Sequence, residues 1–293
     1  MITINKDKYY ILTSKNGKCY VLKYKDGKYY WKPLTSTKSK CKKHKKTCLK
    51  KKKCTKCQQK CLKKCLRKCK KKSLRDYHTI KIPVPKPAGI SGLPEYICFQ
   101  IEDSFTDQQE QRIKDGIFAV LAVWKKHHDQ KWNGGTNNGT SDLAACTNIY
   151  ARKNLKPAWY RRQDIPNVKT VTNMAMDQFT QLIKDNGLKK YCPAKIKAEE
   201  IGDIEVGTIR SLSTSKRFKV PLSIGVNPKQ LDNPRLNISM LAGSLFHAWL
   251  HRAGWDDPKT TAYFISECPM CIMRGYQSKN PAVPDSTYTK FFD

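Results

Sequence analysis

The stretch that decides the fold is HAWLHRAGWDD, residues 247–257. Its two histidines, His247 and His251, are four residues apart, so on an α-helix their side chains project from one face, one turn apart. Gly254 stands where such a helix would end in a left-handed turn, which glycine adopts at little cost. That turn would swing the chain back so that Asp257 reaches the same point. Two imidazoles and one carboxylate around an open position are typical of a catalytic zinc site, so these residues predict bound Zn²⁺.

The same stretch resembles the metzincin class of zinc metallopeptidases. The pattern of that class is His-Glu-x-x-His-x-x-Gly-x-x-His/Asp, followed by a methionine-containing turn beneath the metal. Four of its five positions are matched, by His247, His251, Gly254 and Asp257. An aspartate as the third ligand is similar to the snapalysin-type variant. The resemblance covers about residues 93–276 and implies an α+β, zincin-like fold that hydrolyses peptide bonds of a protein or peptide substrate with zinc-activated water.

One position departs from the family pattern. The catalytic glutamate of the family follows the first histidine, and this chain has Ala248 there. The glutamate accepts a proton from the zinc-bound water and passes it to the leaving amine, which alanine cannot do. The resemblance therefore implies a chain that binds zinc but hydrolyses peptides very poorly. Two explanations stay open: an inactivating substitution made in a protease, or a natural pseudoenzyme.

Residues after the motif supply further candidates for the site. Met273, in Cys-Ile-Met, resembles the Ser-Ile-Met form of the Met-turn, and Met270 is the fallback. Glu267 is a rival third ligand, because a glutamate on a following helix has that role in the gluzincin class. Tyr276 is a candidate transition-state donor close to the zinc, although a core tyrosine fits it as well.

Two other pairs have structural interpretations. Cys268 and Cys271 could form a redox pair, a second metal site, a local disulfide or two buried thiols near the Met-turn. His127 and His128 fall at the end of a predicted helix, where the helix dipole favours positive charge, and we expect no catalytic role for them.

The hydrophobic pattern of the main domain alternates between strand and helix periods. Thr106 with Gln109 resembles a capping box, which predicts the start of a long amphipathic helix. The predicted elements are a strand at 97–101, helices at 107–128, 174–186 and from Ser239 to before Gly254, a strand at 219–226, and a loop at 130–142. This order is similar to the N-terminal subdomain of the metzincins.

Two different segments precede that domain, which we place at residues 88–293. Residues 1–37 predict a small β-meander, with strands at 9–12, 19–22 and 29–31 separated by Asn-Gly and Asp-Gly hairpin signals. Residues 38–87 are a Lys/Cys-rich basic tract and a proline linker. The tract's cysteines recur at helical spacing. Four interpretations stay open: zinc ligation, interchain disulfides, a thiol seam against another helix, and a solvated spacer.

Charge and hydropathy limit the partners and the location. The net charge is +33, and residues 38–75 hold 20 of the 57 basic residues and none of the 24 acidic ones. Such a tract could contact a polyanion such as nucleic acid, or an anionic surface. No run of 18 apolar residues predicts a transmembrane segment, and residues 1–10 lack the apolar core of a secretory signal. We therefore expect a protein that is cytoplasmic in its producer or exported by a dedicated delivery machinery, as a toxin or effector would be.

The alternative function is binding of a polyanion through residues 38–75. If the tract binds phosphates, we expect affinity for heparin or DNA to fall steeply with salt, because each neutralised phosphate releases condensed counterions. The comparison is a chain of residues 76–293, measured over the same salt series. Equal retention of both chains would remove the tract from any such role.

Overall fold

The computed structural model describes residues 76–187, 193–209, 221–256 and 259–293 in full, and the backbone of three short strands before residue 34. The chain divides into two units, Met1–Ser73 and Leu74–Asp293. The three strands of the first unit are β1 (Ile11–Thr13), β2 (Cys19–Lys25) and β3 (Lys28–Pro33), paired antiparallel in that order. This confirms the predicted meander. Residues 38–75 lie outside the described residues, so every interpretation of the basic tract stays a prediction.

A mixed five-stranded sheet organises the second unit. Its strands are β4 (Tyr77–Pro83), β5 (Tyr96–Glu102), β6 (Ala194–Ala198), β7 (Gly207–Thr208) and β8 (Ile224–Val226). The order is β4-β5-β6-β8-β7, with β5, β6 and β8 parallel and the two outer strands antiparallel. The unit is α+β, as the sequence predicts.

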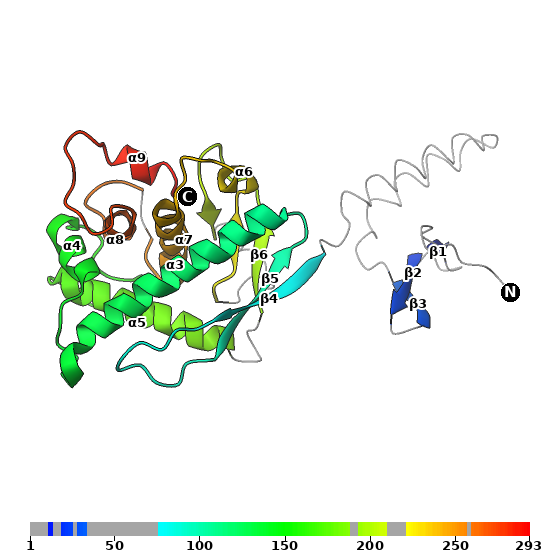
Figure 1. The fold of residues 1–293 in the computed structure, drawn as a ribbon, viewed down its shortest axis with the longest axis horizontal. Coiled ribbons are helices and arrows are strands. Elements are labelled where there is room, and N and C mark those ends of the chain that lie inside the picture. Colours follow the sequence, from blue (N-terminus) through cyan, green and yellow to red (C-terminus); the bar gives the residue numbers. More distant parts are fainter. Residues whose placement is uncertain are drawn as a thin grey trace. The chain divides into compact units, whose positions relative to one another are not determined.

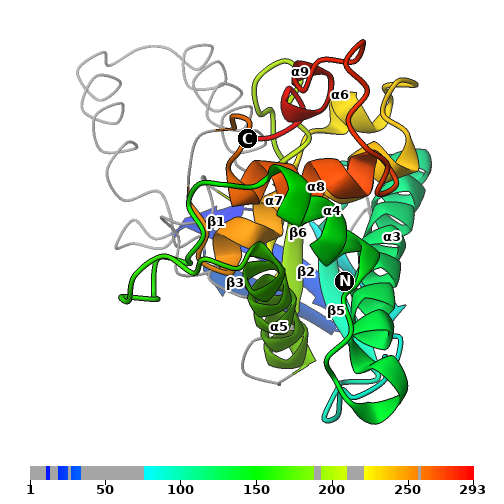
Figure 2. The ribbon, with the colours of Figure 1, turned by 90° about the vertical axis from the view of Figure 1, so that its left-hand side faces the viewer.

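The helices lie together beside this sheet. They are α3 (Asp107–Trp132), the short 3-10 helix η1 (Asn133–Gly135), α4 (Asp142–Tyr150), α5 (Val168–Gly187), α6 (Pro228–Leu231), α7 (Ile238–Arg252), α8 (Phe264–Met273) and α9 (Ser286–Thr289). In Figure 1 the long helix α3 crosses the unit in front of α7, and in Figure 2 helices α3, α4, α5 and α8 lie nearer the viewer than β5 and β6. Within the parts of the chain that are described, no helix has the length and hydropathy to cross a membrane.

The second unit begins earlier than the expected residue 88. Strand β4 pairs with β5 along its whole length, from Tyr77 opposite Glu102 to Pro83 opposite Tyr96. Ile82 of β4 is buried, with 2% of its surface exposed. The residues assigned to a linker therefore include the outer strand of the sheet.

Helix α3 forms where its cap and its apolar stripe predict it. The Thr106 hydroxyl accepts a hydrogen bond from the Gln109 backbone N–H, and the Gln109 side-chain oxygen accepts one from the Thr106 backbone N–H. The helix continues to Trp132, four residues past the predicted end. An unpredicted helix, α4, begins at Asp142, the last residue of the expected loop, and its first turn is capped by the Ser141 hydroxyl. The serine thus ends the Gly/Asn/Thr-rich stretch and caps the helix that follows it.

His127 and His128 differ from their predicted role. Both are buried, and burial lowers the pKa of His127 to about 3. His127 Nδ1 lies 2.7 Å from the Ser141 hydroxyl, and His128 Nε2 lies 3.1 Å from the Thr180 hydroxyl. A neutral His127 packed inside the fold cannot act as a cation at a helix end, so the dipole interpretation is wrong for it.

A disulfide joins α4 to α8, between Cys146 and Cys271. Cys268 is free and fully buried, and burial raises the pKa of its thiol to about 12. The local-disulfide and redox-pair interpretations of Cys268 with Cys271 are therefore wrong, because Cys271 pairs with a residue 125 positions earlier. The disulfide ties α8 to α4, and α8 packs on α7 and carries Ile265, whose carbonyl contacts His247.

We expect the double variant Cys146→Ala, Cys271→Ala to lower the free energy of unfolding by about 2–5 kcal/mol, the usual effect of losing a native disulfide. The measurement is denaturant unfolding under non-reducing conditions. Cys98→Ala is the control, since Cys98 is a free thiol. Unchanged stability of the double variant would show that the cross-link contributes nothing to the folded unit.

Candidate metal centre

Helix α7 places the two histidines one turn apart, as predicted. The Asn237 side chain caps its start by accepting a hydrogen bond from the backbone of Met240 (2.9 Å), and the helix ends at Arg252. Gly254 has a φ of +100°, so its backbone makes the turn that the sequence predicts for it. A Cβ at this position would lie 2.7 Å from the Trp159 ring, so both the conformation and the space require glycine.

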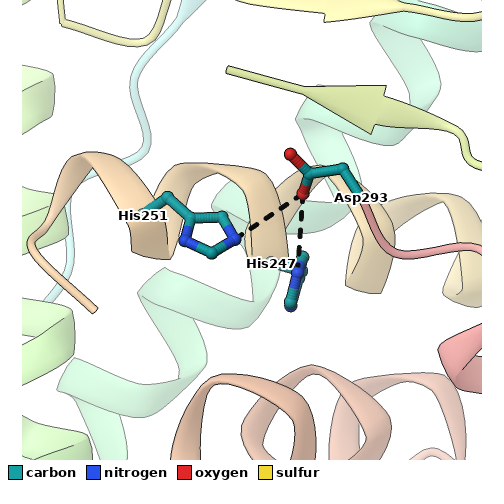
Figure 3. Close-up of side chains that lie close together, drawn as sticks. All are labelled: His247, His251 and Asp293. Atoms are coloured by element: carbon teal, nitrogen blue, oxygen red, sulfur yellow. Dashed lines mark ion pairs between the residues drawn. The ribbon is translucent and has the colours of Figure 1, made fainter. Parts of the chain in front are cut away.

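A third side chain joins the two imidazoles. Asp293 Oδ1 lies 3.5 Å from His247 Nε2 and 3.6 Å from His251 Nε2, and Figure 3 shows the carboxylate facing both rings of α7. His247 and Asp293 are buried and His251 is nearly so, with 1%, 1% and 9% of their side-chain surfaces exposed. One ligand atom from each lies within 4.8 Å of the others, which makes the group a candidate metal site.

Backbone carbonyls fix which nitrogen of each ring faces the carboxylate. His247 Nδ1 lies 2.9 Å from the Ile265 carbonyl, and His251 Nδ1 lies 2.8 Å from the Trp255 carbonyl. A carbonyl can only accept, so each Nδ1 carries a proton, and in the neutral form of each ring the Nε2 lone pair is free. Both Nε2 atoms are buried with no hydrogen-bond partner among the described residues. This is the arrangement that metal-ligating histidines usually show.

The separations suit a small divalent cation. Zinc bonds of about 2.0–2.2 Å at tetrahedral angles place two ligand atoms about 3.3–3.5 Å apart. The two Nε2-to-Oδ1 distances, 3.5 and 3.6 Å, are close to that spacing. Burial, and then the neighbouring His251, lowers the pKa of His247 to about 3. His247 is therefore neutral at ordinary pH, the state that a metal ligand needs.

Strand β7 holds the carboxylate in place. The Thr208 hydroxyl donates to Asp293 Oδ2 at 2.6 Å. β7 is the outer strand beside β8 and lies against α7, so the sheet edge and the histidine helix meet at Asp293. Asp293 also lines a cavity of about 310 Å³ with three glutamates, Glu199, Glu200 and Glu205. The carboxylates of this lining favour the approach of a cation.

The third predicted ligand and the observed carboxylate are different residues. Asp257 lies outside the described residues, so its ligation of a metal stays a prediction. Asp293 was missed because it stands 42 positions after His251, and no local spacing connects the two. The one available signal was an acidic residue that directly follows Phe291 and Phe292, an apolar pair that favours burial.

The two methionine candidates belong to a helix and not to the expected turn. Met270 and Met273 belong to α8 and form a small buried cluster with Phe292, whose ring stacks on His247. α8 approaches α7 closely at Gly243, where a Cβ would lie 2.5 Å from Met273 Cγ. The methionines therefore contact the site through Phe292.

Glu267 and Tyr276, the other two candidates for the metal site, have partners elsewhere in the fold. Glu267 Oε1 accepts hydrogen bonds from the Ala262 backbone and from Lys279 Nζ, at 3.0 and 2.8 Å, and Glu267 is not part of the metal group. The Tyr276 ring packs under Lys126 Nζ at 4.7 Å, and burial raises the pKa of its hydroxyl to about 12. Its recorded contacts favour the core interpretation, and a role as a transition-state donor stays a prediction.

We expect His251→Ala to abolish stoichiometric zinc binding, because one of two imidazole ligands is lost. The measurement is zinc per chain after dialysis, by elemental mass spectrometry. His78→Ala is the control, since His78 is 46% exposed and pairs with Asp103 and Glu110. Asp293→Asn should also weaken zinc binding strongly, and Asp257→Asn tests the other carboxylate. Full zinc content in His251→Ala would exclude the assignment.

Comparison with known proteins adds no relative. The chain matches no protein-family model, and neither the curated proteins nor the solved structures contain a significant match. The chemistry of the site is therefore the basis for any statement on function.

Proposed function

We propose that this chain is a zinc-binding protein of the metallopeptidase type in which Ala248 removes the general base. The observation that carries the proposal is the pair of buried Nε2 atoms, on His247 and His251, that lack a hydrogen-bond partner and face one carboxylate. An unsatisfied polar atom in the interior costs free energy unless a ligand pairs with it. A bound cation would satisfy both nitrogens at once.

Each residue of the site would have a separate role in zinc-dependent hydrolysis. Bound zinc would polarise a substrate carbonyl and lower the pKa of a water molecule. His247 and His251 would hold it, with Nδ1–H donation to Ile265 and Trp255 keeping both rings in place. Asp293 supplies the carboxylate that the structure brings to these rings. Peptide hydrolysis also needs a group to take the proton of the water, and position 248 offers only a methyl group.

The surroundings of Ala248 are apolar. A general base at position 248 would need to face a solvent-filled cleft, and the structure gives Ala248 no exposed surface within the hydrophobic core. A larger side chain there must find space or displace its neighbours. Any restoration of a glutamate therefore needs a control for its size.

Two other functions have separate support. A pseudoprotease would use the same metal site without hydrolysis, and the absence of a general base at Ala248 favours it. Binding of a polyanion would use residues 38–75, and their 20 basic residues without an acidic one favour it. Delivery of the chain as a toxin or effector is a proposal with no structural support.

We expect Ala248→Glu to produce chelator-sensitive cleavage of casein or of the lysine-rich tract. General-base assistance contributes about 10²–10⁴-fold to a rate. The matched control is Ala248→Gln, which has the same size and no base. Circular dichroism and zinc content show whether each variant keeps its fold and its metal.

Two outcomes for the variants at position 248 would contradict the peptidase proposal. If Ala248→Glu is folded, binds zinc and cleaves nothing in a diverse peptide library, the peptidase proposal fails and the pseudoprotease interpretation replaces it. Equal cleavage by the Glu and Gln variants would show that the carboxylate is not the base.

A further inference from the structure

The segment Phe291–Asp293 lies directly on the two histidines. We propose that this segment is an internal ligand that closes the metal site, and that it must withdraw before a substrate or another ligand can reach His247. The part of the proposal that concerns metal access rests on the proposed zinc site. The part that concerns closure rests on the contacts of the segment alone.

The backbone of the segment is held from two directions. The Val206 N–H donates to the Phe291 carbonyl at 3.1 Å, just before strand β7 begins. Lys259 Nζ donates to the Phe292 carbonyl at 3.0 Å and pairs with Glu205 Oε1 at 2.8 Å. The segment thus lies along the edge of the sheet, next to the helix that carries the histidines.

Phe292 covers one face of the first histidine. Its ring stacks on the His247 ring with centroids 4.2 Å apart and planes 5° apart. The Phe292 side chain has no exposed surface, and its other neighbours include Met270 and Met273 of α8. A molecule approaching His247 from this side meets the phenyl ring first.

Asp293 completes the closure at the nitrogens. Its Oδ1 lies 3.5 and 3.6 Å from the two Nε2 atoms, where an external ligand would have to enter. Its Oδ2 accepts the hydrogen bond from Thr208. A carboxylate in this position binds a metal in the closed state and, by the same contact, excludes a competing oxygen ligand.

The closure can be weakened at two places, at a contact on the surface and at the covering ring. Lys259 is 39% exposed, so Lys259→Met removes its bond to the Phe292 carbonyl at the surface. Phe292→Ala removes the covering ring itself. Phe118→Ala is the matched control for a lost phenyl ring, because Phe118 is 42% exposed on α3.

The experiment measures carbethoxylation of individual histidines by diethyl pyrocarbonate in the metal-free full chain, with peptide mass spectrometry as the readout. His78, 46% exposed, reports a freely reactive ring, and His127, 1% exposed, reports an intact core. In the unchanged chain and in Phe118→Ala we expect His247 to be protected like His127. In Lys259→Met and Phe292→Ala we expect His247 to react about tenfold faster or more, since hydrogen bonds to charged groups and buried rings both contribute strongly to closure.

Two results would overturn the proposal: reaction of His247 as fast as His78 in the unchanged chain, or an unchanged His247 rate in Lys259→Met and Phe292→Ala. If His127 also becomes reactive in Phe292→Ala, that variant has lost its core and Lys259→Met decides.

Removal of zinc by excess chelator is the second readout, and it should be faster in the same variants. If the unchanged chain binds no zinc, the proposed function fails, and His247 protection still tests closure.

Discussion

The arrangement of the site depends on two hydrogen bonds, in which His247 and His251 donate their Nδ1 protons to backbone carbonyls. These bonds leave both Nε2 lone pairs pointing at one place, and each acceptor has its own structural cause. The Trp255 carbonyl reaches His251 because Gly254 turns the chain back at a positive φ. The Ile265 carbonyl reaches His247 because α8 packs closely on α7 and is tied to α4 by the disulfide. The packing of the helices therefore determines the chemistry available at the two nitrogens.

The carboxylate comes to this place from the sheet and not from the helix. Asp293 is held by Thr208 on β7, while the Phe292 ring is held by α8 and stacks on His247. Burying a carboxylate costs several kcal/mol unless charged or hydrogen-bonding partners compensate it. The Thr208 hydroxyl compensates one oxygen. The Nε2 lone pairs of neutral imidazoles cannot donate a hydrogen bond to the other oxygen, and a cation between them and the carboxylate would compensate it. A bound cation would therefore stabilise this group, which is why we propose one here.

Local patterns in the sequence predicted the parts of the structure that local interactions form. The Thr106 cap, the apolar stripe of α3, the histidine spacing on α7 and the turn at Gly254 each depend on neighbours a few residues away. The parts that were missed depend on distant contacts. Asp293 meets the histidines only after the sheet edge is assembled, and Cys271 pairs with Cys146 only after α4 and α8 dock. No spacing rule connects such residues, and the buried surroundings of Ala248 likewise follow from tertiary packing.

In a closed, buried site without a general base, a bound metal would stabilise the fold and would not by itself catalyse hydrolysis. A cation that binds the folded chain and not the unfolded chain stabilises the fold by mass action. With ligands on α7 and on the segment after α9, such a cation would join the histidine helix to the sheet edge that holds Asp293. This contribution requires no water, substrate or proton acceptor, so it does not depend on the residue at position 248. Hydrolysis requires a water molecule, a substrate and a proton acceptor. It also requires the Asp293 carboxylate and the Phe292 ring to move so that these groups have room. The same three side chains could therefore hold a structural ion in the proposed closed state, and any use of them in catalysis would depend on how readily Phe291–Asp293 moves away.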